Sequence, residues 1–412
     1  METRIVEALR ETPAGREAEA ILRACVHCGF CTAACPTYRL LGNELDSPRG
    51  RIYLIKQLLE GAPAGPATRL HLDRCLTCRS CETACPSGVH YSRLLETGRR
   101  LALQHAPRAW PARLARAAAR RLLGRPRALA SAMALLRPLR PLLPPGLRRR
   151  LPARPPRFAP PRHDRRVVMV GGCVQPALAP EIDAAAVRVL DAVGISVVSV
   201  PGCCGALHLH LDDEDAARRH ARAVIDACLP HLEAGAEAVV MSASGCSVML
   251  KDYAHLLAGD SRYAEAARRV ADLARDLSEI VHGEADRLPA VPGATAVAFH
   301  APCTLQHGQR LGDNVETILR RLGHELHPVR EAHLCCGSAG AWSLFHPRLS
   351  RRLRQRKLKG LTAENPALIA TANIGCLMHL RAASPVPVVH WVELAADALA
   401  TRQPDPSCYP VR

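Results

Sequence analysis

The sequence contains no apolar run of about 20 residues, which is the length that a transmembrane helix needs. Its first 20 residues are charged and have no apolar core of the kind found in a secretory signal peptide. We therefore expect a cytoplasmic protein, whose thiols stay reduced. In such a protein, cysteine clusters indicate metal binding or catalysis more often than disulfides.

Motifs for other common cofactors are also absent. The sequence has no G-x-G-x-x-G that follows a strand, no phosphate-binding P-loop and no G-x-S-x-G nucleophile elbow. GGCVQP, at residues 171–176, is not a dinucleotide fingerprint. We therefore expect that the chain itself binds neither a flavin nor a nicotinamide.

Acidic residues and lysine are nearly missing from one basic segment. The chain has 55 basic and 38 acidic residues, a net charge of +17. Residues 100–166 alone hold 18 arginines, no lysine and a single acid, Asp164. Because proline is dense there, we interpret residues 101–165 as a linker with one or two short helices, such as ARLARAAARRLL.

Two other roles for this arginine-rich segment stay open. Its charge could dock on an anionic membrane surface or on a partner, or it could attract nucleic acid. The segment has few aromatic residues to stack on bases, Trp110 and Phe158, and the chain has no helicase or nuclease motif. A nucleic-acid partner is therefore not expected.

Eight of the 18 cysteines fall in two runs of identical spacing. CVHCGFCTAACP and CLTCRSCETACP both follow C-x2-C-x2-C-x3-C-P, the run of bacterial two-cluster ferredoxins, in which the fourth cysteine serves the other cluster. Two structural zinc sites are the alternative, but zinc ligands usually come as separated C-x2-C pairs. The sequence therefore predicts two [4Fe–4S] clusters, one on Cys25, Cys28, Cys31 and Cys85, and one on Cys75, Cys78, Cys81 and Cys35.

Residues 1–100, which contain both runs, are expected to form a helical domain. In SPRGRIYLIKQLLEG, Ser47 can cap a helix, Pro48 suits its first turn and Gly61 can end it. Four apolar residues then share one face of the helix: Ile52, Ile55, Leu58 and Leu59.

From residue 166 the pattern changes to alternating strands and helices. RRVVMVGGC, ISVVSVPGCCG and EAVVMSASGC each predict a buried strand that runs into a cysteine. TAVAFHAPC, HELHPVREAHLCCG and PALIATANIGC repeat this plan, although the strand in the fifth segment is polar and less clear. Such alternation predicts a parallel sheet, whose ligands collect at the carboxyl ends of the strands.

Matched cysteine spacings indicate an internal duplication. The gaps from the first cysteine to the pair, and from the pair to the last, are 30 and 43 residues in one copy and 32 and 41 in the other. We expect repeats at residues 166–290 and 291–412. The cysteines of the two copies are Cys173, Cys203, Cys204 and Cys246, and Cys303, Cys335, Cys336 and Cys376.

The four cysteines of each repeat form a candidate metal site, for which we favour one further iron–sulfur cluster. Buried thiols that only fill space, or a catalytic thiol, are the alternatives. The glycine after each pair could let the backbone approach a bulky cofactor. Histidines near these cysteines could hydrogen-bond a cluster sulfur or carry a proton, although each could also be a packing histidine: His208, His210, His300, His307 and His333. Cys228 and Cys408 fit no pattern.

Seven motifs give the chain a family resemblance over nearly its whole length. VHCGFCTAACP, SPRGRIYLIK, CLTCRSCETACPSGVHY, PGCCGALHLH, HAPCTLQHGQ, LCCGSAG and NIGC resemble the iron–sulfur subunit of bacterial glycolate oxidase. That family is similar to the iron–sulfur subunits of lactate-utilisation and anaerobic glycerol-3-phosphate dehydrogenases, and to the Cys-Cys-Gly subunit of heterodisulfide reductase. The expected fold is thus α plus α/β, a helical two-cluster ferredoxin domain followed by a duplicated parallel α/β Cys-Cys-Gly domain.

The resemblance implies an electron-transfer subunit of an oxidoreductase complex. A partner FAD subunit would oxidise glycolate to glyoxylate, and this subunit would pass the electrons toward the quinone pool, at the inner face of the cytoplasmic membrane. An iron–sulfur subunit of a lactate or glycerol-3-phosphate dehydrogenase is the nearest alternative. A nucleic-acid-binding iron–sulfur protein is the alternative from another class.

The sequence departs from the heterodisulfide reductase pattern in one respect. There, each repeat ends in C-x2-C and five cysteines bind an unusual cluster. Here, the positions three residues before Cys246 and Cys376 hold Ala243 and Asn373. Four thiols per repeat favour an ordinary cubane or no cluster over a disulfide-cleaving site.

Overall fold

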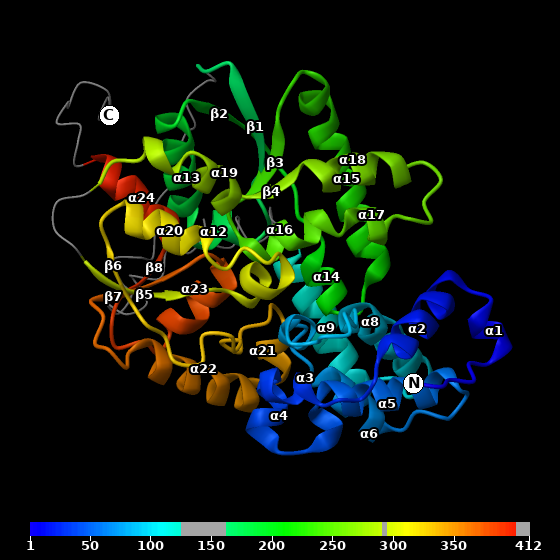
Figure 1. Ribbon diagram of the computed structural model, residues 1–412. Coiled ribbons are helices and arrows are strands. Elements are labelled where there is room, and N and C mark those ends of the chain that lie inside the picture. Colours follow the sequence, from blue (N-terminus) through cyan, green and yellow to red (C-terminus); the bar gives the residue numbers. More distant parts are fainter. Residues whose placement is uncertain (125–161, 291–294, 401–412) are drawn as a thin grey trace.

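The computed structural model describes residues 1–124, 162–290 and 295–400 (Figure 1). A helical N-terminal part is followed by two α/β repeats. The N-terminal helices are α1 (Glu7–Arg10), α2 (Pro13–Ala24), α3 (Phe30–Ala34), α4 (Pro36–Leu41), the 3-10 helix η1 (Glu44–Asp46), α5 (Pro48–Leu59), α6 (Pro66–Asp73), α7 (Ser80–Thr83), α8 (Tyr91–His105) and α9 (Trp110–Leu123). No helix in the described ranges is long and apolar enough to cross a membrane.

Helix α5 follows the sequence prediction closely. The Ser47 hydroxyl accepts a hydrogen bond of 3.0 Å from the Gly50 N–H, which satisfies one of the free donors of the first turn. Just after the helix, Gly61 has a φ of 91°, the left-handed conformation that commonly follows a helix end. The predicted apolar face, Ile52, Ile55, Leu58 and Leu59, is buried in the core of the helical domain.

The arginine-rich segment begins as ordered helix. The boundary expected at residue 100 lies inside α8, which continues to His105 because Leu101 and Ala102 are part of the domain core. Helix α9 confirms the short helix expected in ARLARAAARRLL and packs beside α14 (Ala206–His210). The proline-dense remainder, residues 125–161, lies outside the described residues, as does Cys408.

Each repeat contains one four-stranded parallel sheet, as the alternating pattern predicts. The first sheet has the order β2-β1-β3-β4, with β1 (Arg165–Val170), β2 (Ile195–Val200), β3 (Ala238–Met241) and β4 (Ala274–Asp276). The second has the order β6-β5-β7-β8, with β5 (Ala296–His300), β6 (Glu325–His327), β7 (Leu368–Thr371) and β8 (Val388–His390). The six predicted strands are confirmed, and the identical strand order confirms the duplication.

Helices cover both sheets. In the first repeat they are α12 (Gln175–Leu178), α13 (Pro180–Ala192), α14, α15 (Glu214–Glu233), α16 (Ser244–Lys251), α17 (Tyr253–Leu256), α18 (Ala264–Leu273), α19 (Leu277–Gly283) and the 3-10 turn η3 (Ala285–Arg287). In the second they are the π-helical turn η4 (Thr304–Gly308), α20 (Asn314–Arg321), α21 (Trp342–Phe345), α22 (Pro347–Leu361), α23 (Ile374–Arg381) and α24 (Trp391–Ala400).

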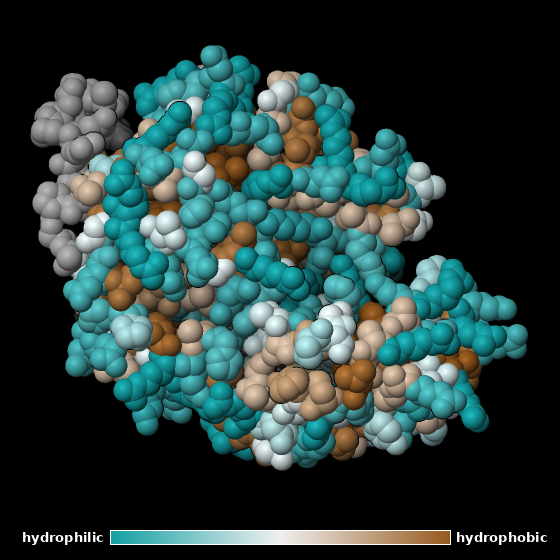
Figure 2. Space-filling model, in the orientation of Figure 1, coloured by the Kyte–Doolittle hydropathy of each residue, from teal (hydrophilic) through white to brown (hydrophobic). Residues whose placement is uncertain are grey.

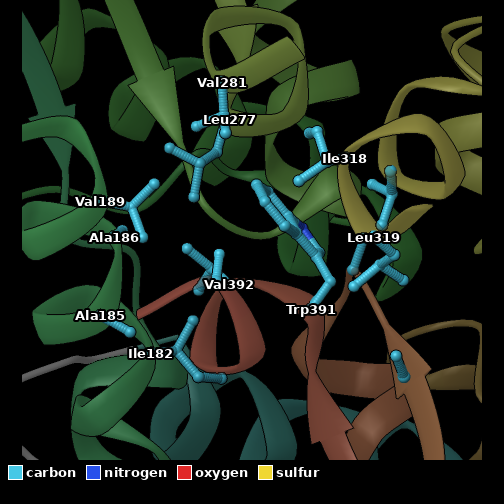
Figure 3. Packing of buried hydrophobic residues seen from close by; sticks show 14 of the residues in the cluster. Ile182, Ala185, Ala186, Val189, Leu277, Val281, Ile318, Leu319, Trp391 and Val392 are labelled. Atoms are coloured by element: carbon cyan, nitrogen blue, oxygen red, sulfur yellow. The ribbon is translucent and has the colours of Figure 1, made fainter. Parts of the chain in front are cut away.

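The two repeats share one hydrophobic core. The helix after the first strand of one repeat packs on the last helix of the other, so that α13 contacts α24 and α20 contacts α19. Figure 3 shows this crossed arrangement, with Val392 of α24 beside Ile182 and Val189 of α13. Trp391, at the start of α24, is fully buried in the same core. The repeats are therefore one folding unit.

The helical domain is joined to the second repeat by side chains from both. The indole N–H of Trp342 donates a hydrogen bond of 3.0 Å to the Asp73 carbonyl. Arg39 lies 2.6 Å from the carboxylate of Glu331. These contacts fix the cysteine runs of the helical domain against the carboxyl end of the second sheet.

Candidate metal centres

The first ferredoxin-type group consists of Cys25, Cys28, Cys31 and Cys85. All four cysteines line one cavity, between the first cysteine run and the start of α5. Cys25 is buried and Cys28 is exposed, so this cavity reaches the surface. The structure thus brings three cysteines of the first run together with the last cysteine of the second run.

The second ferredoxin-type group consists of Cys35, Cys75, Cys78 and Cys81. These four line a neighbouring cavity, and all of them are buried. The exchange of Cys35 and Cys85 between the runs, which the ferredoxin spacing predicts, is thus present in the geometry.

Both runs wrap their cavities with the same backbone conformation. The residues just before and just after the second cysteine have positive φ in each run, 55° and 88° for His27 and Gly29, and 55° and 59° for Thr77 and Arg79. These left-handed residues curl the chain around the cavity. Arg79 adopts this conformation at some cost because it carries a Cβ, unlike its counterpart Gly29.

The chemistry of the second ferredoxin-type group suits an anionic metal cluster. Burial raises the pKa of Cys78 and Cys81 well above the usual thiol range, so metal binding must displace protons there. The buried guanidinium of Arg51 lies 4.0 Å from the Cys35 sulfur and donates a hydrogen bond of 3.1 Å to the Thr37 hydroxyl. A buried cation beside four thiols would balance the negative charge of a thiolate-bound cluster.

The first-repeat group, Cys173, Cys203, Cys204 and Cys246, gathers at the carboxyl ends of β1, β2 and β3. A hydrogen bond between Cys173 and Cys203 lowers the pKa of Cys203 and raises that of Cys173. Cys204 in turn contacts both Cys203 and Cys246. The buried hydroxyl of Tyr253 donates a hydrogen bond of 3.0 Å to the Cys204 carbonyl and holds the pair in place.

The second-repeat group, Cys303, Cys335, Cys336 and Cys376, has the same arrangement. The sulfurs of Cys303 and Cys335 are 3.9 Å apart, and Cys336 contacts both Cys335 and Cys376. The Gly337 N–H points at the Cys335 sulfur, 3.4 Å away. Each repeat therefore brings together the four thiols that the spacing predicted.

The second-repeat group lies next to the second ferredoxin-type group. Cys78 and Cys335 belong to one buried cluster, together with Leu76, Trp342 and Leu353, and Cys303 packs against it. Two of the four thiol groups are thus neighbours across the boundary between the helical domain and the repeats. No pattern in the sequence predicts this contact.

Comparison with known proteins assigns the chain to a family. The 4Fe-4S dicluster domain matches residues 21–89, and the Cysteine-rich domain matches residues 167–251 and 297–381. The chain is 49% identical to the glycolate oxidase iron-sulfur subunit of Escherichia coli (strain K12) over 408 residues, which cover 97% of this chain and 99% of that protein. The chain belongs to the family of glycolate oxidase iron–sulfur subunits. The resemblance inferred from the motifs is confirmed.

Other relatives of this glycolate oxidase subunit family are more distant. The probable glycolate oxidase iron-sulfur subunit of Bacillus subtilis (strain 168) is 29% identical over 92% of this chain and 94% of its own length. Lactate utilization protein A of Geobacillus thermodenitrificans is 29% identical over 51% of this chain and 90% of its own length. The lactate-utilisation relatives thus match only about half of this chain.

The glycine after each cysteine pair is required by local packing. Gly205 and Gly337 have φ values of 89° and 90°. A Cβ on Gly205 would lie 2.9 Å from the Ala217 carbonyl oxygen, and one on Gly337 would lie 2.8 Å from that of Ser350. Both positions therefore require glycine for close packing on α15 and α22, and the approach of the backbone to a cofactor stays a prediction.

The structure separates the five candidate histidines. His208 stacks on His220 with ring centroids 4.6 Å apart, and His210 packs against Gly340. His307 is hydrogen-bonded to the Thr83 hydroxyl and to the His333 carbonyl, at 3.1 and 2.9 Å. His300 alone is grouped with two of the candidate cysteines: its ring, Cys336 and Cys376 present ligand atoms within 4.8 Å of one another, and all three are buried.

The sequence analysis did not predict two buried cations near the thiols. Arg51 and Lys357 lie on α5 and α22, whose patterns read as ordinary amphipathic helices with exposed cations. Cys228, which fitted no pattern, is fully buried among apolar residues of α15.

Proposed function

We propose that this chain is the electron-transfer subunit of a complex that oxidises glycolate to glyoxylate. A partner FAD subunit would hold the substrate, since the sequence has no flavin or nicotinamide motif. Oxidation of glycolate releases two electrons and two protons, and reduction of a quinone to a quinol consumes both. This subunit would carry the electrons between those two reactions.

The observation that carries the proposal is the pair of cavities in the helical domain. Three cysteines of one run and the fourth cysteine of the other line each cavity, as two-cluster ferredoxins require, and Cys81 also borders the first cavity. We assign one [4Fe–4S] cluster to Cys25, Cys28, Cys31 and Cys85, and one to Cys35, Cys75, Cys78 and Cys81. Bound clusters of this type supply one-electron transfer.

The exposed face of the first ferredoxin-type group suits docking of the FAD subunit. Figure 2 shows hydrophobic side chains gathered over α3, next to this group. Val26 and Phe30, which alternate with the ligand cysteines, are 67% and 65% exposed. Exposed apolar side chains around a redox centre are typical of a protein interface.

The repeats would each hold one further cluster on their four cysteines. The four thiols of each repeat are already in contact, and the second repeat has a buried ammonium beside them, Lys357. The absence of a fifth cysteine is visible in the fold: Asn373 stands at that position and donates a hydrogen bond of 3.5 Å to the Cys376 sulfur. Electron transfer, not disulfide cleavage, fits this set.

We propose a cytoplasmic location, peripheral on the inner face of the membrane, with a quinone as acceptor and without nucleic acid. Arg108, between α8 and α9, and Arg120 of α9 do not supply the membrane contact, because they pair with acids of the protein itself. Arg108 bonds both Asp73 and Asp212, and Arg120 lies 3.3 Å from Asp213. These ion pairs fasten the start of the arginine-rich segment to the fold.

Anaerobic purification of the full chain, with iron and zinc analysis, tests the cluster assignment. Two cubanes in the helical domain require about eight irons per chain, and further iron would belong to the repeats. Zinc in place of iron would overturn the proposal.

Mixing with the purified FAD partner tests the electron donor. The visible absorbance of this chain should bleach when glycolate is added to the mixture and not when lactate is added. Bleaching by lactate alone would reassign the chain to the lactate class.

A further inference from the structure

The two repeats carry different residues at a position close to their cysteines. Three residues before the first cysteine stands Val170 in the first repeat and His300 in the second. His300 is the last residue of β5 and is 1% exposed. Neither of its ring nitrogens has a hydrogen-bond partner among the described residues. A buried polar group is costly when it has no partner, so these unpaired nitrogens indicate a ligand-binding position.

The missing partner of His300 must lie on the side of the thiols. A ring nitrogen of His300 and the sulfurs of Cys336 and Cys376 are all within 4.8 Å of one another. Imidazole and thiolate are both ligands of iron, and the two can share one iron–sulfur cluster.

A second position also changes from an apolar side chain in the first repeat to a polar one in the second. Gly205 packs on Ala217 and Gly337 packs on Ser350, and seven residues further along each helix stand Val224 and Lys357. In the first repeat, Val170 and Val224 both pack around Gly202, beside the cysteine pair. In the second, an imidazole and an ammonium replace these two valines. The pair of sites is therefore apolar in one repeat and polar in the other.

Lys357 is buried without a carboxylate. It is 4% exposed, and its ammonium donates hydrogen bonds of 3.0 Å to the carbonyls of Glu331 and Ala332. No ion pair within the described ranges includes it, and it lies near the four thiols of its own repeat. A buried cation of this kind requires a nearby anion, which a thiolate-bound metal centre would provide.

We propose that His300 takes the place of one of the four thiolates as a ligand of the metal centre in the second repeat, which makes that centre a mixed imidazole–thiolate site and leaves the first repeat an all-thiolate site. This rests on the proposed function, in which both repeats bind iron–sulfur clusters. A neutral imidazole ligand and a buried ammonium both favour the reduced, more negative state of a cluster. The midpoint potential of the second-repeat site should therefore be higher than that of the first-repeat site. It is also the site that lies beside Cys78.

Pulsed EPR on the full chain, purified anaerobically and partly reduced, tests the ligand. A protein labelled with ¹⁵N-histidine should show a nitrogen coupling at one reduced centre that differs from the coupling in unlabelled protein. His300→Val, which copies the first repeat, should lose this coupling and shift the midpoint potential of one centre to more negative values. His390→Val is the matched control, because His390 is equally buried at the end of β8 but is not grouped with cysteines.

The iron content separates the two ways in which the inference could fail. More than about eight irons per chain without a histidine coupling in the labelled parent would remove His300 as a ligand and leave the clusters of the repeats intact. About eight irons in the parent would mean that the repeats are empty. Both the assignment of clusters to the repeats and the assignment of His300 as a ligand would then be wrong. The labelling experiment uses the parent protein, so it tests the ligand even if His300→Val folds poorly.

Discussion

The guanidinium of Arg79 lies 2.7 Å from the Asp252 carboxylate, although the two residues are 173 positions apart in the chain. Arg79 belongs to the second cysteine run and Asp252 follows α16 in the first repeat. Arg93, from α8, bonds the other oxygen of the same carboxylate at 2.9 Å. One acid of the first repeat thus secures the loop that holds the second ferredoxin-type group.

Asp252→Asn should loosen this attachment. The change leaves two partly buried arginines without their carboxylate, and we expect a loss of about 2 kcal/mol in the free energy of unfolding. Hydrogen exchange should accelerate in residues 75–93. Glu316→Gln is the control: Glu316 pairs with Arg320 on the exposed face of α20, so its loss should cost about 0.5 kcal/mol or less. Equal effects of both changes would contradict the role of Asp252.

Cys28→Ser should remove one cluster and leave the fold intact. Cys28 is the exposed ligand of the first ferredoxin-type group, so its change disturbs no packing. The iron content should fall by about four per chain, while the circular dichroism of the helices stays the same. Cys228→Ser is the control, since Cys228 is buried outside the four thiol groups and should keep all the iron. Full iron retention in Cys28→Ser would contradict the assignment.

Iron analysis of the double variant Cys204→Ser and Cys336→Ser measures what the repeats contain. Each change removes the thiol that contacts two others of its repeat group. We expect the iron content to fall toward about eight per chain. The two cubanes of the helical domain should persist, with unchanged EPR signals. About eight irons in both the parent and the variant would show that the repeats bind no cluster.

Asp183 should make stability depend on pH. Burial raises its pKa to about 6, while the Gln175 amide and the Ser242 hydroxyl donate to it at 2.6 and 2.8 Å. Because the folded pKa is raised, the protonated acid contributes stability below its ordinary pKa, and this is lost as the pH rises through 6. Asp183→Asn keeps the acceptor oxygen and should gain about 1 kcal/mol relative to the parent between pH 5 and pH 8 in anaerobic urea unfolding.

The exposed Asp286→Asn provides the reference for this pH series. Its side chain is fully exposed, so the variant should follow the parent at every pH. Parallel stability curves for Asp183→Asn and the parent would mean that Asp183 is ionised throughout, and would contradict the prediction.

Local patterns sufficed where neighbours in the sequence decide the structure. The cysteine runs, the capped helix α5 and the six strands all follow from spacing and polarity within some ten residues. Strands β4 and β8 were missed because each has only three residues, ARD and VVH, and, unlike the equally short β6, neither belongs to a segment that runs into a cysteine. Both are edge strands that form because the longer β3 and β7 offer them a partner.

The distinctions among candidate residues depended on contacts that no local pattern contains. His300 was one of five histidines near cysteines, and only the meeting of β5 with α23 places it beside Cys336 and Cys376. Lys357 and Arg51 lie on helices rich in basic residues, where a solvated side chain is the usual outcome. Their burial follows from the docking of whole elements, as does the contact between Cys78 and Cys335.

The crossed packing of α13 on α24 and of α19 on α20 bears on the ancestry of the chain. A lone repeat would present the apolar face around Trp391 or Ile182 to water, and a second identical copy could cover it about a twofold axis. A symmetric dimer, however, must carry the same side chains at both of its sites. Duplication of the sequence removes that constraint, and one site can then carry Val170 while the other carries His300.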